Sequence, residues 1–222
     1  MLEVQGLGLS YRRGWWKPAE HVVLRDVSFQ LSSGECLGIT APSGAGKTTL
    51  ARCLIRLIEP SAGSIRFDGL DVCALPGQAL RQLRRRMQVV FQNAASSFHP
   101  AFTVRHFLAE PFQVAHRPVP DPRPLLAQVD IAAEHLDRLA VRLSGGQRQR
   151  LLIARALSLQ PTVIIADEPT ASLDDDRVQL VTELLAAYMR NGGALLLLTH
   201  DTTTLQALAT RRLLLNDGQL RY

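Results

Sequence analysis

Residues 35–58 change abruptly from an apolar run to a glycine-rich segment and then to a helical pattern. The run ECLGIT is followed by APSGAGKTT and then by LARCLIRLI, in which leucines recur at helical spacing. The middle segment has the spacing G-x-x-x-x-G-K-[ST] of a phosphate-binding loop, except that Ala41 occupies the first glycine position. In the order strand, loop, helix, the backbone N–H groups of such a loop and the positive end of the helix both face the phosphates. This feature predicts an α/β protein that binds a nucleotide.

Individual loop residues have distinct expected roles. The inner glycines Gly44 and Gly46 matter most, because the chain must approach the phosphates closely and needs positive φ. We expect Lys47 to bridge the terminal phosphates and the Thr48 hydroxyl to ligate Mg²⁺. A methyl group at Ala41 is tolerable if φ is negative there, so we treat this departure as minor. The predicted nucleotide-binding residues of the loop are Ala41, Pro42, Ser43, Gly44, Ala45, Gly46, Lys47, Thr48 and Thr49.

The remaining apolar patterns predict a mainly parallel sheet flanked by helices. The runs MQVVFQ, PTVIIADE and GALLLLTH do not alternate, which is typical of buried parallel strands, and HVVLRDVSFQL alternates like a half-buried strand. Helical patterns lie between these runs. Residues 93–150, with the proline-rich RPVPDPRP, show no convincing strand. We therefore predict one domain, 1–222, with an α/β core of residues 1–92 and 151–222 and an inserted helical subdomain, 93–150, which carries LSGGQ.

Two further segments favour phosphate chemistry. The strand VIIADE ends in two carboxylates, which would place Asp167 near the metal that Thr48 serves and leave Glu168 to orient or deprotonate a water. In isolation, Asp-Glu-Pro can also be a simple polar turn with a helix cap, and its combination with the upstream loop disfavours that alternative. Ser144 before Gly145 in LSGGQ predicts a second anion site at a helix start. One chain seldom needs two phosphate cradles for one nucleotide, so we expect two copies to complete each other's sites.

At this point the sequence resembles the ATP-binding subunits of ABC transporters over essentially its whole length. The motifs APSGAGKTT, the glutamine of VVFQN, LSGGQ, VIIADEPT, SLDD and LLTHD occur in the family's order. The resemblance implies an α/β fold of the P-loop NTPase type, with an antiparallel N-terminal β part and the inserted helical subdomain. It also implies that two subunits stack head to tail and trap two ATP molecules.

The resemblance implies roles for residues outside the loop. Tyr11 would stack on adenine, although Trp15 and Trp16 are rivals for this role. Gln92 would contact Mg²⁺, directly or through water, together with Thr48 and Asp167.

Further implied roles concern catalysis and the opposite subunit. Glu168 would be the general base, and His200 would hold the γ-phosphate and the attacking water. The residues implied to serve the opposite subunit's ATP are Ser144, Gly145, Gly146 and Gln147, and Asp174 would cross the dimer interface.

One stretch is similar to a particular branch of the family. RRRMQVVFQNAASSFHP is similar to the FQDPxxSLNP stretch of subunits that serve peptide, nickel and metallophore importers, with Asn93 and Phe98 as departures. The chain stops at NDGQLRY without a C-terminal extension, which favours the shorter nickel or metallophore type. Those importers commonly use two non-identical ATPase subunits. We therefore expect a heterodimer that works with transmembrane permease subunits and indirectly with a solute-binding protein.

Composition limits where such a chain works. No apolar run approaches the roughly 20 residues that cross a bilayer, and the first residues carry no signal-like pattern. We expect a peripheral subunit on the cytoplasmic face of the inner membrane. Cys36, Cys53 and Cys73 are expected to be reduced, buried thiols.

Two alternative functions stay open. The cluster RQLRRRMQ, within a net charge of +5, is by default a solvated helix face, but it would also suit a soluble ABC-type ATPase that acts on nucleic acid or ribosomes. Such proteins usually carry two ATPase units or long coiled-coil insertions, so no nucleic acid is expected here. A regulatory subunit that binds ATP without hydrolysis is disfavoured, since Glu168, Gln92 and His200 are all present.

Overall fold

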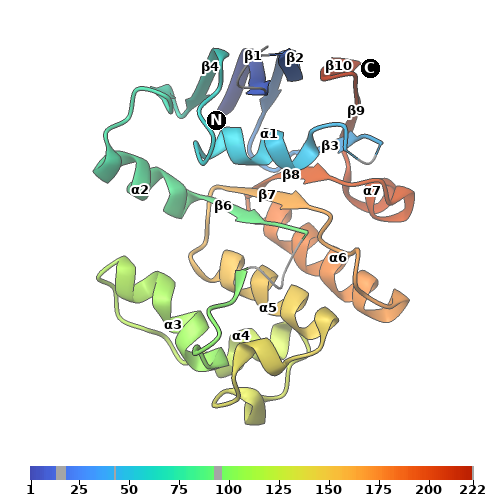
Figure 1. Ribbon diagram of the computed structural model, residues 1–222. Helices are drawn as coiled ribbons and strands as arrows, with labels where there is room; N and C mark the ends of the chain where they lie inside the picture. Colours follow the sequence, from blue (N-terminus) through green and yellow to red (C-terminus); the bar gives the residue numbers. More distant parts are fainter. Residues whose placement is uncertain (14–18, 43, 93–96, 222) are drawn as a thin grey trace.

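The computed structural model describes residues 1–13, 19–42, 44–92 and 97–221, arranged as two sheets with helices around them (Figure 1). The strands are β1 Leu2–Arg13, β2 Ala19–Leu31, β3 Cys36–Thr40, β4 Ala62–Phe67, β5 Leu70–Asp71, β6 Met87–Val90, β7 Val163–Asp167, β8 Ala194–Leu198, β9 Arg211–Asn216 and β10 Gln219–Arg221. The helices are α1 Lys47–Leu54, α2 Gly77–Arg86, α3 Val104–Val114, α4 Arg123–Gln128, α5 Gly145–Ser158, α6 Asp175–Arg190 and α7 Thr202–Leu208, with 3₁₀ turns at Ala133–His135 and Ala140–Arg142.

The first sheet is antiparallel and has the order β2-β1-β4-β5. Leu2, the first residue of the inner strand β1, lies opposite Leu31 on one side and Phe67 on the other, so large apolar side chains meet across three strands. This sheet confirms the antiparallel N-terminal β part.

The second sheet positions the functional residues and has the order β10-β9-β3-β8-β7-β6. Its pairs are parallel apart from β9 and β10. Every residue of β7 and β8 is buried, as expected for parallel strands that are covered on both faces. The carboxyl ends of β3, β7 and β8 meet at one edge, because the strands run in the same direction. The segments that follow these three strands therefore come together.

Three hydrophobic clusters hold the layers together. The first joins the antiparallel sheet, α1 and one face of the parallel sheet, and Figure 1 shows α1 between the two sheets. The second joins the other face to α5, α6 and α7. The third lies among α3, α4 and α5 and contains Phe98, Phe107 and Leu126. Within residues 97–143 the only β pairing described is the single bridge between Thr103 and Leu139.

The helical part therefore has its own core, as expected of a subdomain. The proposed boundary after residue 150 falls inside α5, so the division of the chain at 93 and 150 stays a prediction.

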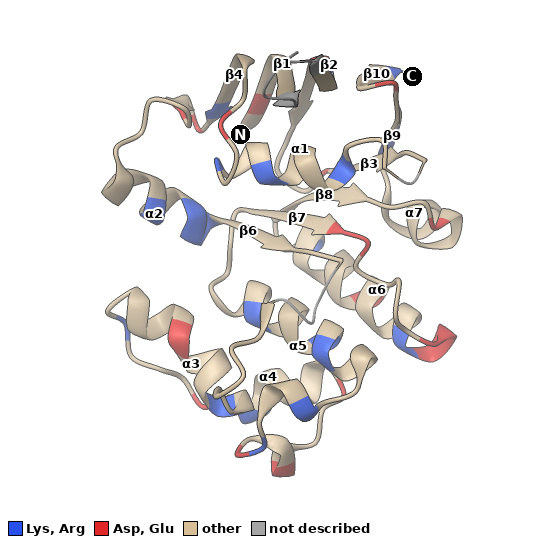
Figure 2. Ribbon diagram, in the orientation of Figure 1, with Lys and Arg blue, Asp and Glu red and all other residues tan. Residues whose placement is uncertain are grey.

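The basic cluster lies on α2 (Figure 2), but two of its arginines make contacts within the chain instead of forming the expected solvated helix face. Arg84 is half-buried and donates hydrogen bonds to the carbonyl oxygens of Ile55 and Arg56, at 2.9 and 2.8 Å. Arg85 donates to the carbonyl oxygen of Val114 on α3, at 2.6 Å. The expectation is wrong for these two arginines, because they satisfy carbonyl groups where neighbouring helices end.

The three cysteines are free thiols, as predicted. Burial, with a smaller contribution from Glu35, raises the pKa of Cys36 to about 12, and burial also raises the pKa of Cys53 to about 11. Both thiols are therefore protonated and unreactive at neutral pH. Cys73 is only partly buried.

Candidate functional site

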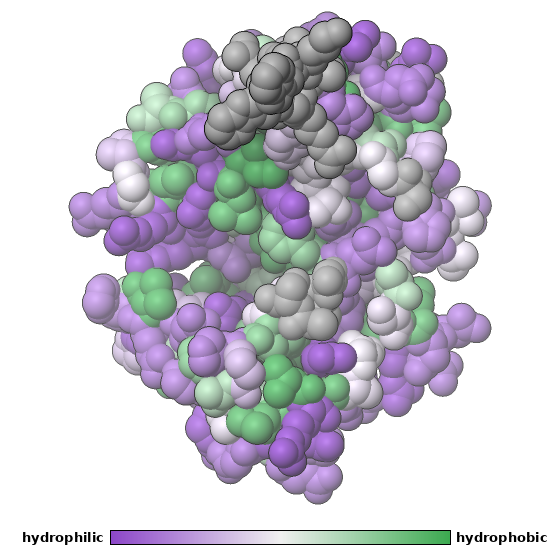
Figure 3. Space-filling view, in the orientation of Figure 1, coloured by the Kyte–Doolittle hydropathy of each residue, from purple (hydrophilic) through white to green (hydrophobic). Residues whose placement is uncertain are grey.

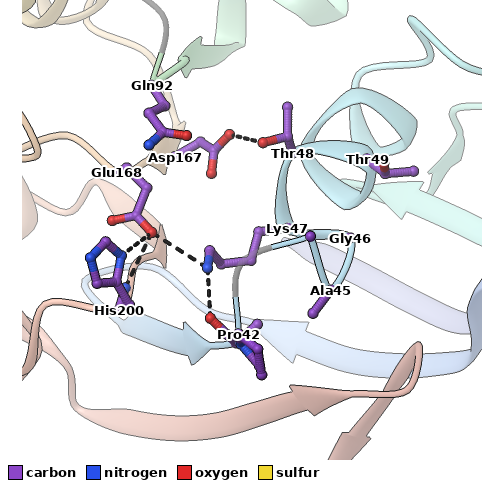
Figure 4. A pocket seen from close by; sticks show the side chains of 12 residues that line it. Pro42, Ala45, Gly46, Lys47, Thr48, Thr49, Gln92, Asp167, Glu168 and His200 are labelled. Atoms are coloured by element: carbon purple, nitrogen blue, oxygen red, sulfur yellow. Dashed lines mark hydrogen bonds and ion pairs between the residues drawn. The ribbon is translucent and has the colours of Figure 1, made fainter.

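A cavity of about 420 Å³ opens where the segments after β3, β7 and β8 meet (Figure 4). Its lining residues are Ala41, Pro42, Gly44, Ala45, Gly46, Lys47, Thr48, Thr49, Gln92, Asp167, Glu168 and His200. All twelve are predicted site residues, drawn from four separate segments of the chain. The predictions for Ser43, Trp15 and Trp16 lie outside the described residues.

The loop after β3 has the backbone conformation that its glycines were expected to supply. Gly44 has φ 80° and Gly46 has φ 104°, both in the left-handed region that favours glycine. A Cβ atom on Gly46 would lie 3.2 Å from Val23 Cγ1 of β2, so the loop also packs closely on the antiparallel sheet. The carbonyl oxygen of Gly46 accepts a hydrogen bond from the Leu50 N–H at 2.8 Å, which starts α1. The N–H groups of the first turn of α1 are left for a ligand.

Ala41 fits the loop without strain. Its φ is negative, so a methyl group is tolerated at this position, as expected from the sequence. The side chain is buried in the main core, and the carbonyl oxygen accepts a hydrogen bond from Lys47 Nζ at 2.7 Å. The contact that Ala41 makes in the cavity is therefore made by its backbone.

We expect the Ala41→Gly substitution to change ATP affinity by less than about tenfold, or 1.4 kcal/mol, because the backbone contact is kept. Titration calorimetry of both proteins with ATP measures the difference. Gly46→Ala is the contrasting variant, since its Cβ atom would be strained at φ 104° and close to β2. A much larger gain in affinity for Ala41→Gly would show that the alanine impairs the loop.

Asp167 and Thr48 form an oxygen-rich corner of the cavity. Thr48 Oγ1 donates a 2.5 Å hydrogen bond to Asp167 Oδ2, while Oδ1 is buried and has no hydrogen-bond partner among the described residues. Burial raises the pKa of the Asp167 carboxyl, the charge of Glu168 adds to this, and the Thr48 hydrogen bond opposes it. The side chain of Gln92 lies beside this corner (Figure 4). An unpartnered carboxylate oxygen next to a hydroxyl and an amide fits a hard cation such as Mg²⁺.

Glu168 is held from both sides by the segment that follows β8. Its backbone has φ 52°, unusual for a glutamate, and its N–H donates to the carbonyl oxygen of Leu198 at 2.8 Å. The Oε1 atom lies 2.7 Å from His200 Nδ1 and 3.4 Å from Lys47 Nζ (Figure 4). The Oε2 atom accepts a 2.7 Å hydrogen bond from Thr199 Oγ1. The side chain of Glu168 is 5% exposed, whereas that of His200 is 71% exposed at the rim.

Thr199 is the residue of this group that sequence reasoning missed. The sequence did contain a signal for Thr199. A hydroxyl residue that directly precedes His200 must lie near the site to which His200 belongs. His200 itself was less predictable, because a histidine after a buried strand is often a core residue. Its exposure at the rim excludes that alternative.

Tyr11 does not line this cavity. It is 39% exposed on β1 and lies opposite His21 of β2. His21 lines a second cavity of about 490 Å³, which shares Pro42, Gly44 and Ala45 with the first. The β1–β2 strand pair, which carries Tyr11, therefore borders a cavity that residues of the phosphate-binding loop also line.

The LSGGQ segment lies outside the cavity and forms the start of α5. The Ser144 side chain accepts a hydrogen bond from the Gln147 N–H at 3.2 Å, and the Gln147 side chain accepts one from the Ser144 N–H at 3.0 Å. A Cβ atom on Gly146 would lie 3.3 Å from both Leu173 Cδ2 and the carbonyl oxygen of Ser172. The glycine thus allows close contact with the SLDD segment. In this pair Ser144 and Gln147 use their side-chain oxygens and their own N–H groups, so the pair leaves the Ser144 hydroxyl proton, the Gln147 side-chain NH2 and the N–H groups of Gly145 and Gly146 as donors at this helix start.

Asp174 also lies outside the cavity and caps α6. Its side chain accepts a hydrogen bond from the Arg177 N–H at 3.0 Å. Neither Asp174 nor the LSGGQ segment contacts the cavity of its own chain, so the roles proposed for them in a partner subunit stay predictions.

Comparison with known proteins identifies the family. Residues 24–171 match the family model described as ABC transporter. The chain belongs to the ABC transporter family. It is 38% identical to a Brucella ovis protein whose name describes a peptide import ATP-binding protein, over 99% of this chain and 70% of that protein. It is 37% identical to the nickel import ATP-binding protein NikE of Pseudomonas putida, over 96% of this chain and 78% of NikE.

Solved structures of this family have the same fold. The dimeric ABC transporter cassette MJ0796 matches with a TM-score of 0.90 and 26% identity, over 100% of this chain and 97% of that one. MJ0796 has also been solved as a dimer in a post-hydrolysis state with ADP and Pi bound. The predicted P-loop NTPase fold and the resemblance to ABC ATPases are confirmed.

Proposed function

We propose that this chain is the ATP-hydrolysing subunit of an ABC importer. The observation that carries the proposal is the cavity, where the glycine-rich loop, Asp167, Glu168 and His200 come together in one chain of this family. ATP hydrolysis requires a loop that binds the phosphates, a carboxylate that holds a metal ion, and a base that acts on the attacking water. These groups must lie within a few ångströms of each other.

In the proposed mechanism, the loop and the start of α1 bind the phosphates of ATP through backbone N–H groups. Lys47 changes partners in this step. Its Nζ atom lies 2.7 Å from the carbonyl oxygen of Ala41 and 3.4 Å from Glu168 Oε1, and it would leave the carboxylate to reach the terminal phosphates. ATP binding would thereby remove Lys47 from Oε1 of Glu168 and leave His200 as its partner.

Glu168 then accepts a proton from the attacking water at Oε1, and His200 at the rim orients the water and the γ-phosphate. Thr48, Gln92 and Asp167 would hold Mg²⁺, which supplies neutralisation of phosphate charge when it is bound. The buried, unpartnered Oδ1 of Asp167 supports this assignment.

A second ATPase subunit would complete the site. The start of α5 does not line the cavity of its own chain. We therefore propose that it contacts ATP bound to the opposite subunit, through Ser144, Gly145, Gly146 and Gln147. Asp174 would cross the interface beside them. We propose a non-identical partner, as in the importer branch that the sequence resembles.

The proposed cargo is a peptide or nickel, in keeping with the names of the two relatives, or a metal–metallophore complex, which the sequence resemblance alone suggests. Among the described helices, none is long and apolar enough to cross a bilayer. In keeping with the two importer relatives, we propose peripheral attachment to transmembrane permease subunits at the cytoplasmic face, with a solute-binding protein acting through them. Arg84 and Arg85 are engaged within the chain, which weakens the argument for nucleic acid as a partner.

The test is affinity isolation of the Glu168→Gln variant with Mg-ATP from detergent-solubilised native membranes, followed by mass spectrometry. A variant that also carries Lys47→Ala gives the ATP-independent background. Enrichment of permease subunits and a second ATPase supports the importer. Enrichment of nucleic-acid-bound or ribosomal partners instead would contradict the transport function and leave the ATP chemistry standing.

A further inference from the structure

Thr199 occupies a fixed position between β8 and α7. Its relative exposure is 0%, and its backbone N–H donates to the carbonyl oxygen of Ile39 on β3 at 3.2 Å. The main chain therefore holds Thr199 against the parallel sheet independently of its side chain. It does not line the cavity, although its neighbour His200 does.

The hydrogen bonds of the Thr199 hydroxyl fix the direction of its proton. The Asp201 N–H donates to Thr199 Oγ1 at 3.0 Å, so at this contact the oxygen is an acceptor. The hydroxyl proton is then available for Glu168 Oε2, at 2.7 Å, because an ionised carboxylate only accepts hydrogen bonds. The hydroxyl thus receives one hydrogen bond and donates one to the carboxylate.

The two oxygens of Glu168 consequently have different surroundings. Oε2 faces buried Thr199, whereas Oε1 faces His200 and Lys47, which both line the cavity. If Lys47 leaves for the phosphates, Oε1 loses one partner while Oε2 keeps its own. The arrangement presents a defined oxygen to the cavity.

We propose that Thr199 is a positioning residue for the reaction, which holds Oε2 of Glu168 so that Oε1 faces the attacking water. The inference rests on the proposed ATP hydrolysis and on Glu168 as the base. Thr199 acts through Glu168 and does not touch the nucleotide. Loss of its hydroxyl should therefore lower turnover and leave ATP binding unchanged.

The test compares Thr199→Val, which keeps the side-chain shape, with Thr199→Ser, which keeps the hydroxyl. Each variant is purified as the full chain with the subunits that it requires for turnover, and kcat, KM and ATP affinity are measured. We expect Thr199→Val to lower kcat at least about tenfold with KM within about twofold, since a hydrogen bond to a charged group is lost. Thr199→Ser should stay within about threefold of the unsubstituted chain. Thr170→Val is the matched control, because Thr170 is also buried and, among the described residues, its hydroxyl has that of Thr204 as its one hydrogen-bond partner, at 3.4 Å.

The outcomes separate this inference from the proposed function. An unsubstituted chain that hydrolyses no ATP would contradict the proposed function itself. Normal kcat in Thr199→Val, or equal losses in the Val and Ser variants, would overturn the positioning role while leaving hydrolysis established. If Thr199→Val does not fold, Thr199→Ala tests the same loss of the hydroxyl, and a kcat equal to that of Thr199→Ser would overturn the proposal.

Discussion

Replacing Glu168 with glutamine is expected to lower ATP hydrolysis about 10²- to 10⁴-fold, the range for loss of a general base. Glutamine has the same shape, and its one amide oxygen can keep the hydrogen bond from Thr199 while the NH2 group takes the place of Oε1 beside His200. ATP affinity should be unchanged or higher, because Lys47 no longer has to leave a carboxylate that lies 3.4 Å away. Steady-state phosphate release and calorimetric titration with ATP in the same buffer measure the two effects.

Glu183→Gln is the matched control, since Glu183 is an exposed carboxylate on α6 outside the cavity. It should leave both hydrolysis and affinity unchanged. Hydrolysis by the Glu168 variant within about threefold of the unsubstituted rate would exclude Glu168 as the base. Loss of ATP binding in the same variant would show that the carboxylate acts on nucleotide binding, contrary to the proposed mechanism.

The sequence predicted the parts of the fold that have continuous apolar runs. The runs at β3, β7 and β8 contain consecutive buried positions, as expected for strands that are covered on both faces, whereas β6 has only its two end residues buried. The motifs follow these strands directly, so their meeting at one sheet edge followed from the parallel arrangement. The cavity residues of the loop, with Asp167 and Glu168, were predicted in this way, whereas Gln92 and His200 were predicted through the family resemblance.

The partly exposed strands β4 and β9 gave no comparable signal. In β4 only Ile65 and Phe67 are buried, and β9 places two buried leucines, Leu213 and Leu215, among exposed or half-buried neighbours. Alternation over so few residues does not distinguish a strand from a turn.

Backbone conformations that depend on tertiary contacts also escaped prediction. The helical pattern after the loop continues to Ile58, but α1 ends at Leu54, and Arg56 adopts φ 53°. Leu57 is consequently 54% exposed. Glu168 adopts φ 52° for a different reason, since its N–H pairs with β8. Neither residue type favours this region, so neighbouring elements decide it.

Replacing Lys47 with alanine is expected to weaken ATP binding roughly 10- to 100-fold, the range for losing a hydrogen-bonded charge at the phosphates. The chain has two lysines, Lys17 and Lys47, and many more arginines. A lysine in the loop is therefore unusual for this sequence. Its side chain is 10% exposed and ends between a carbonyl oxygen and a carboxylate. A compact ammonium group fits there, whereas a planar guanidinium is larger and demands a flat partner. Calorimetric titration with ATP compares Lys47→Ala, Lys47→Arg and Arg66→Ala, the last being a control on the exposed side of β4.

Lys47→Arg separates charge from shape in this prediction. If the ammonium is required, the arginine variant should bind ATP nearly as weakly as the alanine variant, although its charge is unchanged. Affinity restored to within about threefold by arginine would mean that charge alone acts at this position. Unchanged affinity in Lys47→Ala would contradict the phosphate-binding role of the loop. Thermal unfolding of each variant must accompany the titrations, because removal of Lys47 also leaves buried Glu168 without its lysine partner. A loss of affinity in a variant that unfolds at the same temperature as the unsubstituted chain is therefore a loss of contacts with the nucleotide.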